Sequence, residues 1–163
     1  MTPIAGETTL PAMHARHAPD SYRALPWWAL AACAPALLIV IAVLSPEGGL
    51  VDQLARSVFA PFCHQDPTRS LLLQGHLLPV CARCTGFYMG LALAGTLLFG
   101  ALIAGRRTPA ARAWLWLLLP LAIDGLANLT GAWQTPDGVR LAVGAAAALP
   151  FALLIMDSRR VAH

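Results

Sequence analysis

Four residues that can bind a metal ion lie close together near the middle of the chain: Cys63, His64, Cys81 and Cys84. A C-x-x-C pair supplies two ligands from one turn, and the upstream Cys-His pair can supply two more, with His76 as the alternative imidazole. Thiolates together with imidazole favour zinc in a Cys3His tetrahedron. We therefore predict a metal site, with zinc as its ion.

Thiol–disulfide chemistry is the second hypothesis for the same cysteines. Outside the cytoplasm thiols tend to oxidise, so Cys81 and Cys84 could cycle as a redox pair, with Cys63 as the attacking or resolving thiol. Arg83 and the start of a helix after Cys84 would favour the thiolate form. Four-span membrane oxidoreductases of the quinone-linked kind also carry a C-x-x-C, but they normally need a second cysteine pair.

A third hypothesis is a non-catalytic binding or transport protein for an anionic lipid headgroup or a small anion. Arg69, Arg83 and Arg140 would then bind the anion, and the cysteines would only staple a loop through a disulfide or zinc. The remaining candidates for a polar pocket are Gln65, His76, Asp124 and Asn128.

The composition indicates a membrane protein. Hydrophobic residues make up 58% of the 163 residues and charged residues only 12%, whereas soluble domains carry about 25% charged residues. The mean hydropathy is +0.64. With so much of the chain in lipid, we expect no role in binding nucleic acid.

Four apolar runs set the predicted fold. Each spans 17 or 18 residues, close to the ~20 that cross the hydrocarbon core of a bilayer. We predict an all-α bundle of four transmembrane helices that forms a single domain over residues 26–157. Residues 1–25 and 158–163 are predicted to be cytoplasmic tails, the first of them disordered. The four runs cover residues 27–44, 87–104, 113–129 and 139–156.

Between the first two runs lies the segment that carries the candidate site. Residues 50–62 alternate apolar and polar residues at helical spacing, which predicts an amphipathic helix lying on the membrane or on the bundle. Residues 63–84 hold most of the polar candidates and read as a compact, re-entrant surface loop, because the apolar piece 71–78 is too short to span. Gly86 and Gly90 then form a G-x-x-x-G pattern, which favours close packing of helices.

The distribution of arginine predicts the orientation. Four spans put both termini on one side, together with Arg16, Arg23, Arg106, Arg107, Arg112, Arg159 and Arg160. The other side carries Arg56, Arg69, Arg83 and Arg140. The positive-inside rule then places both termini in the cytoplasm and the Cys/His loop outward, in a multi-pass protein of the cell (inner) membrane.

One carboxylate lies inside the third apolar run. An ionisable residue in a span usually faces the interior of the bundle and has a partner there. Asp124 lies near the outer end of its helix, with Asn128 one turn later on the same face. Arg140 begins the fourth helix on that outer side, so we predict an Asp124–Arg140 ion pair.

The sequence also resembles a family of small prokaryotic membrane proteins, the domain of unknown function 2085. The likeness covers roughly residues 55–150, and it is carried by Cys63-His64-Gln65, by Arg69-Ser70 and by residues 78–90, which include C-A-R-C-T-G. Later matches are Pro120, Asp124-Gly125 and Arg140 with Gly144. The resemblance implies an integral membrane protein, favours His64 over His76 as a ligand and implies no activity.

Overall fold

The computed structural model describes residues 25–73, 75–104, 110–131 and 133–161, and this part of the chain is mostly helical. Residues 1–24 and 162–163, which include nearly all of the first predicted tail and the last two residues of the second, lie outside it. The described ranges contain five α-helices and a two-stranded sheet.

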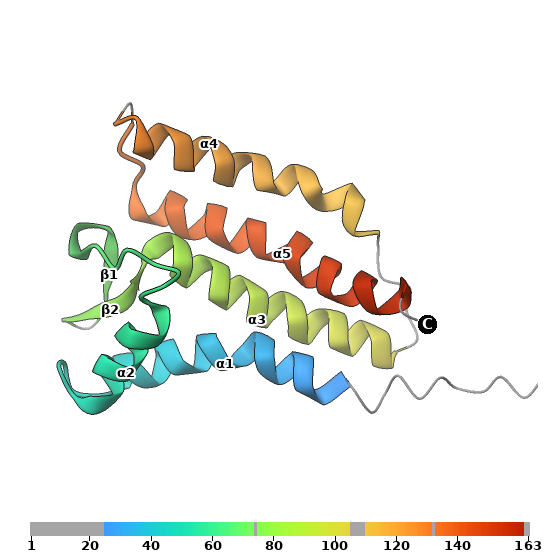
Figure 1. Cartoon of the computed structure of the whole chain (residues 1–163), viewed down its shortest axis with the longest axis horizontal. Helices are drawn as coiled ribbons and strands as arrows, with labels where there is room; N and C mark the ends of the chain where they lie inside the picture. The colour runs from blue at the N-terminus through green and yellow to red at the C-terminus, as the bar shows by residue number, and fades with distance from the viewer. Residues whose placement is uncertain (1–24, 74, 105–109, 132, 162–163) are drawn as a thin grey trace, which may run out of the picture.

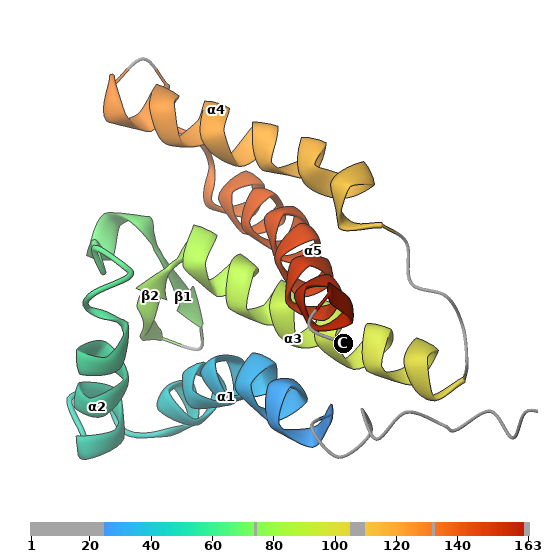
Figure 2. The ribbon, with the colours of Figure 1, turned by 45° about the vertical axis from the view of Figure 1, so that its right-hand side comes forward.

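Four long helical segments lie side by side in one layer, in the order α1, α3, α5, α4 (Figure 1). Segments that follow each other in the sequence run in opposite directions, so the neighbours α3 and α5 run parallel. Figure 2 shows the same order from a second direction. A 3-10 helix, η3, leads directly into α4. The segments are α1 (Leu25–Leu44), α3 (Ala82–Ile103), η3 (Ala111–Leu117), α4 (Leu118–Leu129) and α5 (Asp137–Val161).

Two of the four predicted spans have the length and hydropathy of a helix that crosses a membrane. They are Ala82–Ala101 in α3 and Asp137–Ile155 in α5, whereas the apolar stretch Leu30–Leu44 of α1 is shorter. The two candidate spans are also neighbours in the layer (Figure 1). The structure therefore supports a mostly helical protein with two candidate membrane spans.

The short helix α2 (Leu50–Phe59) is amphipathic, as its sequence predicts, and caps one end of the layer. It buries Asp52, Ala55 and Phe59 beneath it. Three of its aliphatic side chains are exposed on the opposite side, so this helix presents an apolar stripe that suits a membrane interface. The stripe and its continuation consist of Leu50, Leu54, Val58 and Phe62.

An antiparallel β-hairpin replaces the compact, re-entrant loop that the sequence predicts. Strand β1 (Ser70–Leu73) pairs with β2 (His76–Cys81), with Ser70 opposite Cys81. Gly75, at φ +85°, adopts the left-handed backbone that a tight hairpin connection needs. Pairing satisfies the backbone groups of the apolar run 71–78 without placing it in lipid.

The helices α3 and α5 approach each other until their backbones touch. A Cβ atom at Gly86 would overlap the carbonyl oxygen of Leu141, and one at Gly144 would overlap the carbonyl oxygen of Arg83. Gly90 makes a similar approach to α5. The predicted G-x-x-x-G contact is thus observed, and its partner surface on α5 includes Gly144.

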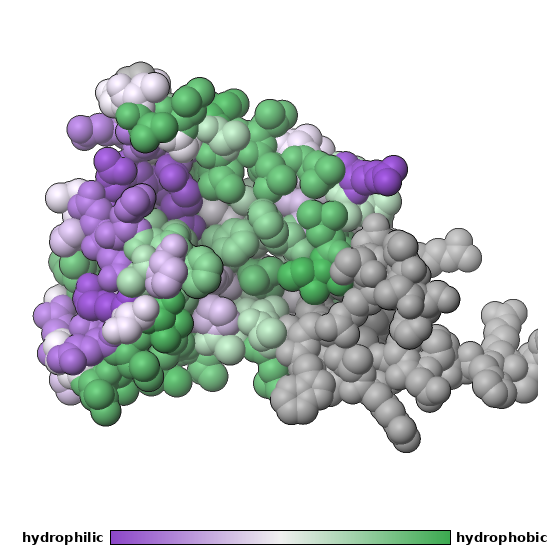
Figure 3. Space-filling model, viewed as in Figure 1, coloured by the Kyte–Doolittle hydropathy of each residue, from purple (hydrophilic) through white to green (hydrophobic). Residues whose placement is uncertain are grey.

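The polar residues gather at one end of the molecule. Figure 3 shows hydrophilic surface at the end that carries α2 and the hairpin, and a largely hydrophobic surface along the helices. Such a division fits a bilayer around the helices and a polar cap outside it.

Gly86→Ala should destabilise the protein by about 1–3 kcal/mol or more, because the new methyl group meets a backbone carbonyl that cannot rotate away. Thermal unfolding in a mild detergent would measure this. Gly100→Ala is the matched control on the same helix, since nothing lies within 4 Å of a Cβ there. Equal midpoints for the two variants would contradict the proposed backbone contact.

Candidate functional site

Three cysteines from three different elements meet at the polar end. Cys63 follows α2, Cys81 ends β2 and Cys84 lies in the first turn of α3. Their sulfur atoms all lie within 4.8 Å of one another. Zinc–sulfur bonds of about 2.3 Å place tetrahedral sulfur ligands roughly 3.8 Å apart, so a small contraction would fit the cluster to a metal ion.

The local backbone explains how Cys63 reaches its partners. The backbone N–H of Cys63 donates to the carbonyl oxygen of Phe59 at 2.9 Å, so the chain continues to turn after α2. Gln65 then adopts a positive φ of 53°, and its side-chain Nε2 donates to the carbonyl oxygen of Arg56 at 2.5 Å. This anchored turn holds the Cys63 thiol, which is buried, against the hairpin.

Backbone N–H groups point at two of the three sulfur atoms. The N–H of Cys81 donates to the Sγ of Cys63 at 3.2 Å, and the N–H of Gln65 also donates to that sulfur. The Sγ of Cys81 accepts from the N–H of Cys84. Hydrogen bonds of this kind stabilise a thiolate, and they are the outer-shell contacts that orient metal ligands.

The pKa values of two of these thiols are shifted in opposite directions. Hydrogen bonds from the thiols of Cys81 and then Cys84 hold the pKa of Cys63 far below its usual range. The pKa of Cys81 is raised, chiefly because its proton bonds to Cys63. Cys63 is therefore the thiol of this pair that loses its proton more readily. All four cysteines of the chain are described, and all are free.

Neither candidate histidine lies in the thiol cluster. The side chain of His64 is exposed, although its residue adjoins Cys63. His76 lies at the start of β2, where its Nδ1 is 3.7 Å from the Oε1 of Glu47, so it faces the α1–α2 connection. The structure brings three of the four predicted metal ligands together and leaves His64 outside.

Asp124 is at the centre of a second polar group, and its ion pair differs from the predicted one. The guanidinium of Arg83, between the two cysteines of the C-x-x-C, bonds directly to the Asp124 carboxylate. The prediction of an Asp124–Arg140 pair is wrong, because Arg83 pairs with Asp124 while the guanidinium of Arg140 donates to Asn128 and pairs with Asp137. Thr135 also donates to this carboxylate.

Arg140 joins the same group through Asn128. The Nδ2 of Asn128 donates to Asp124 Oδ1 at 2.9 Å, and its Oδ1 accepts from Arg140 Nη2 at 3.0 Å. The Nη1 of Arg140 donates to Asp137 Oδ1 at 3.2 Å. Arg83, Asp124, Asn128 and Arg140 thus form one continuous chain of hydrogen bonds that begins beside the cysteines.

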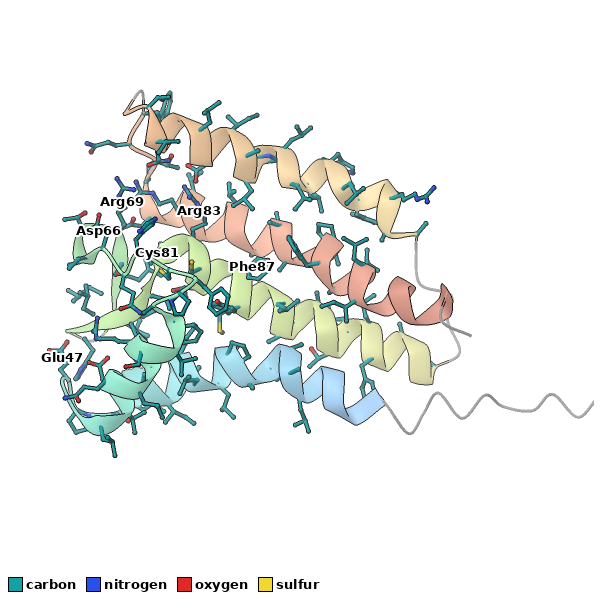
Figure 4. All side chains as sticks on the ribbon, in the orientation of Figure 1. Glu47, Asp66, Arg69, Cys81, Arg83 and Phe87 are labelled. Atoms are coloured by element: carbon teal, nitrogen blue, oxygen red, sulfur yellow. The ribbon has the colours of Figure 1, made fainter. Side chains whose placement is uncertain are left out.

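An open pocket of about 520 Å³ adjoins this chain. Arg69 lies at the same end of the molecule as Cys81 and Arg83, as Figure 4 shows. Several pocket residues were not expected from the sequence, although the Thr-Pro-Asp-Gly turn before an apolar helix is a signal for the start of a helix that could have marked them. The lining consists of Thr68, Arg69, Gln134, Thr135, Pro136, Asp137 and Arg140.

Comparison with known proteins gives a family and no activity. A family model described as a predicted membrane protein (DUF2085) matches residues 63–154, from the first clustered cysteine into α5. An uncharacterised protein of Methanothermobacter thermautotrophicus is 37% identical over 98 residues, which are 59% of this chain and 86% of that protein. The uncharacterised protein MJ1492 of Methanocaldococcus jannaschii is 32% identical over 90 residues, 54% of this chain and 57% of that one. No solved structure matches.

Asp124→Asn should destabilise the protein by about 3 kcal/mol, because it leaves the guanidinium of Arg83 without its counter-charge in a partly buried position. Chemical unfolding in detergent would measure the loss. Asp66→Asn is the control, since Asp66 pairs with Arg69 at the surface and its loss should cost at most about 1 kcal/mol. A small effect at Asp124, equal to that at Asp66, would contradict the central position given to this carboxylate.

Proposed function

This chain belongs to the DUF2085 family of predicted membrane proteins, and from that premise we propose that it is a membrane metalloprotein that binds zinc at its outward polar face. The ligands are the thiolates of Cys63, Cys81 and Cys84, with His64 as the fourth. The metal ties together α2, the hairpin and α3, and the polar face that it organises binds a lipid headgroup or a small anion.

The observation that supports the metal most strongly is the arrangement around the three sulfur atoms. Three thiols within 4.8 Å of one another are costly to keep if all of them ionise, unless a cation compensates their charge. The backbone N–H groups that reach Cys63 and Cys81 favour the thiolate form, which is the form that binds metal. Sulfur-rich tetrahedral sites favour zinc among divalent ions.

His64 is proposed as the fourth ligand because of its position and its freedom. It adjoins Cys63, and its exposed ring makes no hydrogen bond or ion pair among the contacts found for the described residues. A turn of its side chain toward the sulfur atoms would therefore break no described contact. Four protein ligands make a closed, structural site, whereas three would leave a position open to solvent.

Four membrane crossings with both termini in the cytoplasm are part of the proposal. The 20 residues of α1 extend over about 30 Å. The seven residues of η3 and the 12 of α4 together extend over about 32 Å, because a 3-10 helix rises more per residue. Both lengths match the ~30 Å hydrocarbon core, and the four segments alternate in direction along the sequence, which would return the chain to the cytoplasm.

Thiol–disulfide exchange is the second candidate function. The low pKa of Cys63 beside two further thiols would suit an attacking thiolate in an oxidising compartment. Metal and disulfide exclude each other at these sulfur atoms, so a single set of measurements separates the two functions.

Detergent-purified protein should contain about one zinc ion per chain, and Cys81→Ser should lose nearly all of it, because the remaining ligands no longer complete the tetrahedron. Elemental mass spectrometry with a protein assay gives the ratio. Cys33→Ser is the matched control, since Cys33 lies in α1, outside the cluster. A metal-free wild type whose intact mass shows two of the clustered thiols oxidised would instead establish the disulfide alternative.

The same zinc measurement, extended to competition with a chelator, tests the fourth ligand. His64→Ala should lower zinc affinity by roughly tenfold or more, while His76→Ala should not, because His76 lies beside Glu47. Equal affinities for the two variants would assign the fourth position to solvent and leave the three thiolates in place.

A reporter enzyme that is active only outside the cytoplasm should be active when fused after Asp66 and inactive when fused after Ala110. The two positions lie at opposite ends of the helix layer in the described structure. Reporter activity would be normalised to the amount of fusion protein, measured by immunoblot. Activity of the Ala110 fusion alone would reverse the proposed orientation, and activity of both fusions would contradict the odd number of crossings between them.

A further inference from the structure

The open pocket at the polar end is separate from the sulfur cluster, and it brings together two segments far apart in the sequence. Its walls come from η2 (Pro67–Arg69) and from the turn that leads into α5. At about 520 Å³ it is the size of pockets that hold small organic ligands, and it exceeds the volume of an inorganic ion.

The charges around this pocket favour an anion. The lining holds the guanidinium groups of Arg69 and Arg140 and one carboxylate, that of Asp137, so it carries a net charge of +1; the carboxylate that pairs with Arg69, that of Asp66, lies outside the lining. The pKa of Asp66, just outside the lining, lies below its usual range, first because the Thr68 hydroxyl donates to it and further because of the charges of Arg69 and Arg140. The positive field of both arginines therefore reaches this side of the pocket.

The side chain of Arg140 is fixed in position at the pocket. Its side chain is only 9% exposed, and its two amino groups are fixed by Asn128 at 3.0 Å and by Asp137 at 3.2 Å. Each of these contacts uses one N–H of an amino group that carries two. The buried carboxylate that could neutralise Arg140, that of Asp124, already pairs with Arg83.

Arg69 is the movable partner. Its side chain is 50% exposed, and it pairs with Asp66, which is itself 36% exposed, at 3.3 Å. Exposed pairs of this kind contribute little stability, so a ligand with a stronger charge can take over the guanidinium without disturbing the fold. Arg69 and Arg140 can then bind one anion from opposite walls.

We propose that this pocket binds a phosphate ester, with Arg140 as the fixed ligand and Arg69 as the closing one. Guanidinium groups bind phosphate oxygens through paired hydrogen bonds, and the pocket leaves room for the organic group that the phosphate carries. The ester is either a free phosphate ester or the headgroup of an anionic phospholipid. The inference gives a ligand class to the proposed polar face, but it does not depend on the metal.

Isothermal titration of the full chain in an uncharged detergent tests this with two probes, glycerol 3-phosphate and a short-chain phosphatidylglycerol, and with short-chain phosphatidylcholine as the neutral comparison. Arg69→Gln should weaken binding about tenfold or more, since it removes charged hydrogen bonds. Arg140→Gln should do at least the same. Arg112→Gln is the matched control, because it removes the same charge from an exposed position in η3, at the other end of the layer.

Each outcome decides one point. Binding of glycerol 3-phosphate alone assigns the pocket to free phosphate esters, and binding of phosphatidylglycerol alone assigns it to a lipid headgroup; binding of both supports the shared chemistry. The proposal is overturned if neither probe binds, if phosphatidylcholine binds as tightly as phosphatidylglycerol, or if Arg69→Gln behaves like wild type. Because Arg69 lies in the short helix η2 and its side chain is half-exposed, Arg69→Gln should fold, and a folding defect in Arg140→Gln leaves the test intact.

Zinc content measured on the same samples keeps this test apart from that of the metal. Protein that carries zinc and binds neither probe would overturn the pocket and retain the metal site. Protein that binds the ester but contains no zinc would retain the pocket and overturn the metal site.

Discussion

The polar end of this protein depends on a direct backbone contact between the first turn of α3 and α5. The C-A-R-C segment can lie on α5 because Gly144 has no side chain, and Gly86 allows the same approach one turn later. This contact fixes Cys84 and aims Arg83 at α4. Without it, neither the sulfur cluster nor the Arg83–Asp124 pair would have its geometry, since both depend on the same turn. The two glycines therefore determine where Arg83 and Cys84 lie, although they have no reactive side chain themselves.

Residue types and hydropathy were sufficient to predict a mostly helical fold and the three cysteines of the cluster, whereas His64 lies outside the cluster. Long apolar runs satisfy their backbone groups most easily as helices, so the helical fold follows from where these runs lie in the sequence. The meeting of Cys63 with the C-x-x-C could likewise be expected, because soft ligands in an otherwise apolar chain seldom lie near one another by chance. The hairpin could not be predicted this way, because Leu71–Leu73 and Leu77–Leu78 are apolar without clear alternation, and only pairing with each other turns them into strands.

The ion pairs between different helices were the feature least predictable from the sequence. Two arginines, Arg83 and Arg140, could have paired with Asp124, and the sequence placed both on the same side of the membrane. The choice depends on which helices are neighbours and how far each guanidinium reaches. In the layer α5, which carries Arg140, is the neighbour of α4, yet the guanidinium that reaches Asp124 is that of Arg83 at the start of α3. Such a contact is a property of packing that no single segment encodes. The position of His64 is similar, because a residue next to a buried cysteine can point either inward or outward.

Because Asp124 pairs with Arg83 and not with Arg140, the Arg140 guanidinium remains near the pocket at the polar end. Asp124 accepts hydrogen bonds from Arg83, Thr135 and Asn128, so both of its oxygen atoms have partners. Its charged partner is Arg83, the arginine of the C-x-x-C motif. Among the described contacts, Arg140 donates to the amide oxygen of Asn128 and pairs with the carboxylate of Asp137, which is 41% exposed to solvent. A pair with a partly exposed carboxylate contributes little stability, so Arg140 can also bind a second anion. An arginine that is fixed at the wall of a pocket in this way suits an anion from outside the chain, and the Asp124–Arg83 pair anchors the turn beside the sulfur cluster.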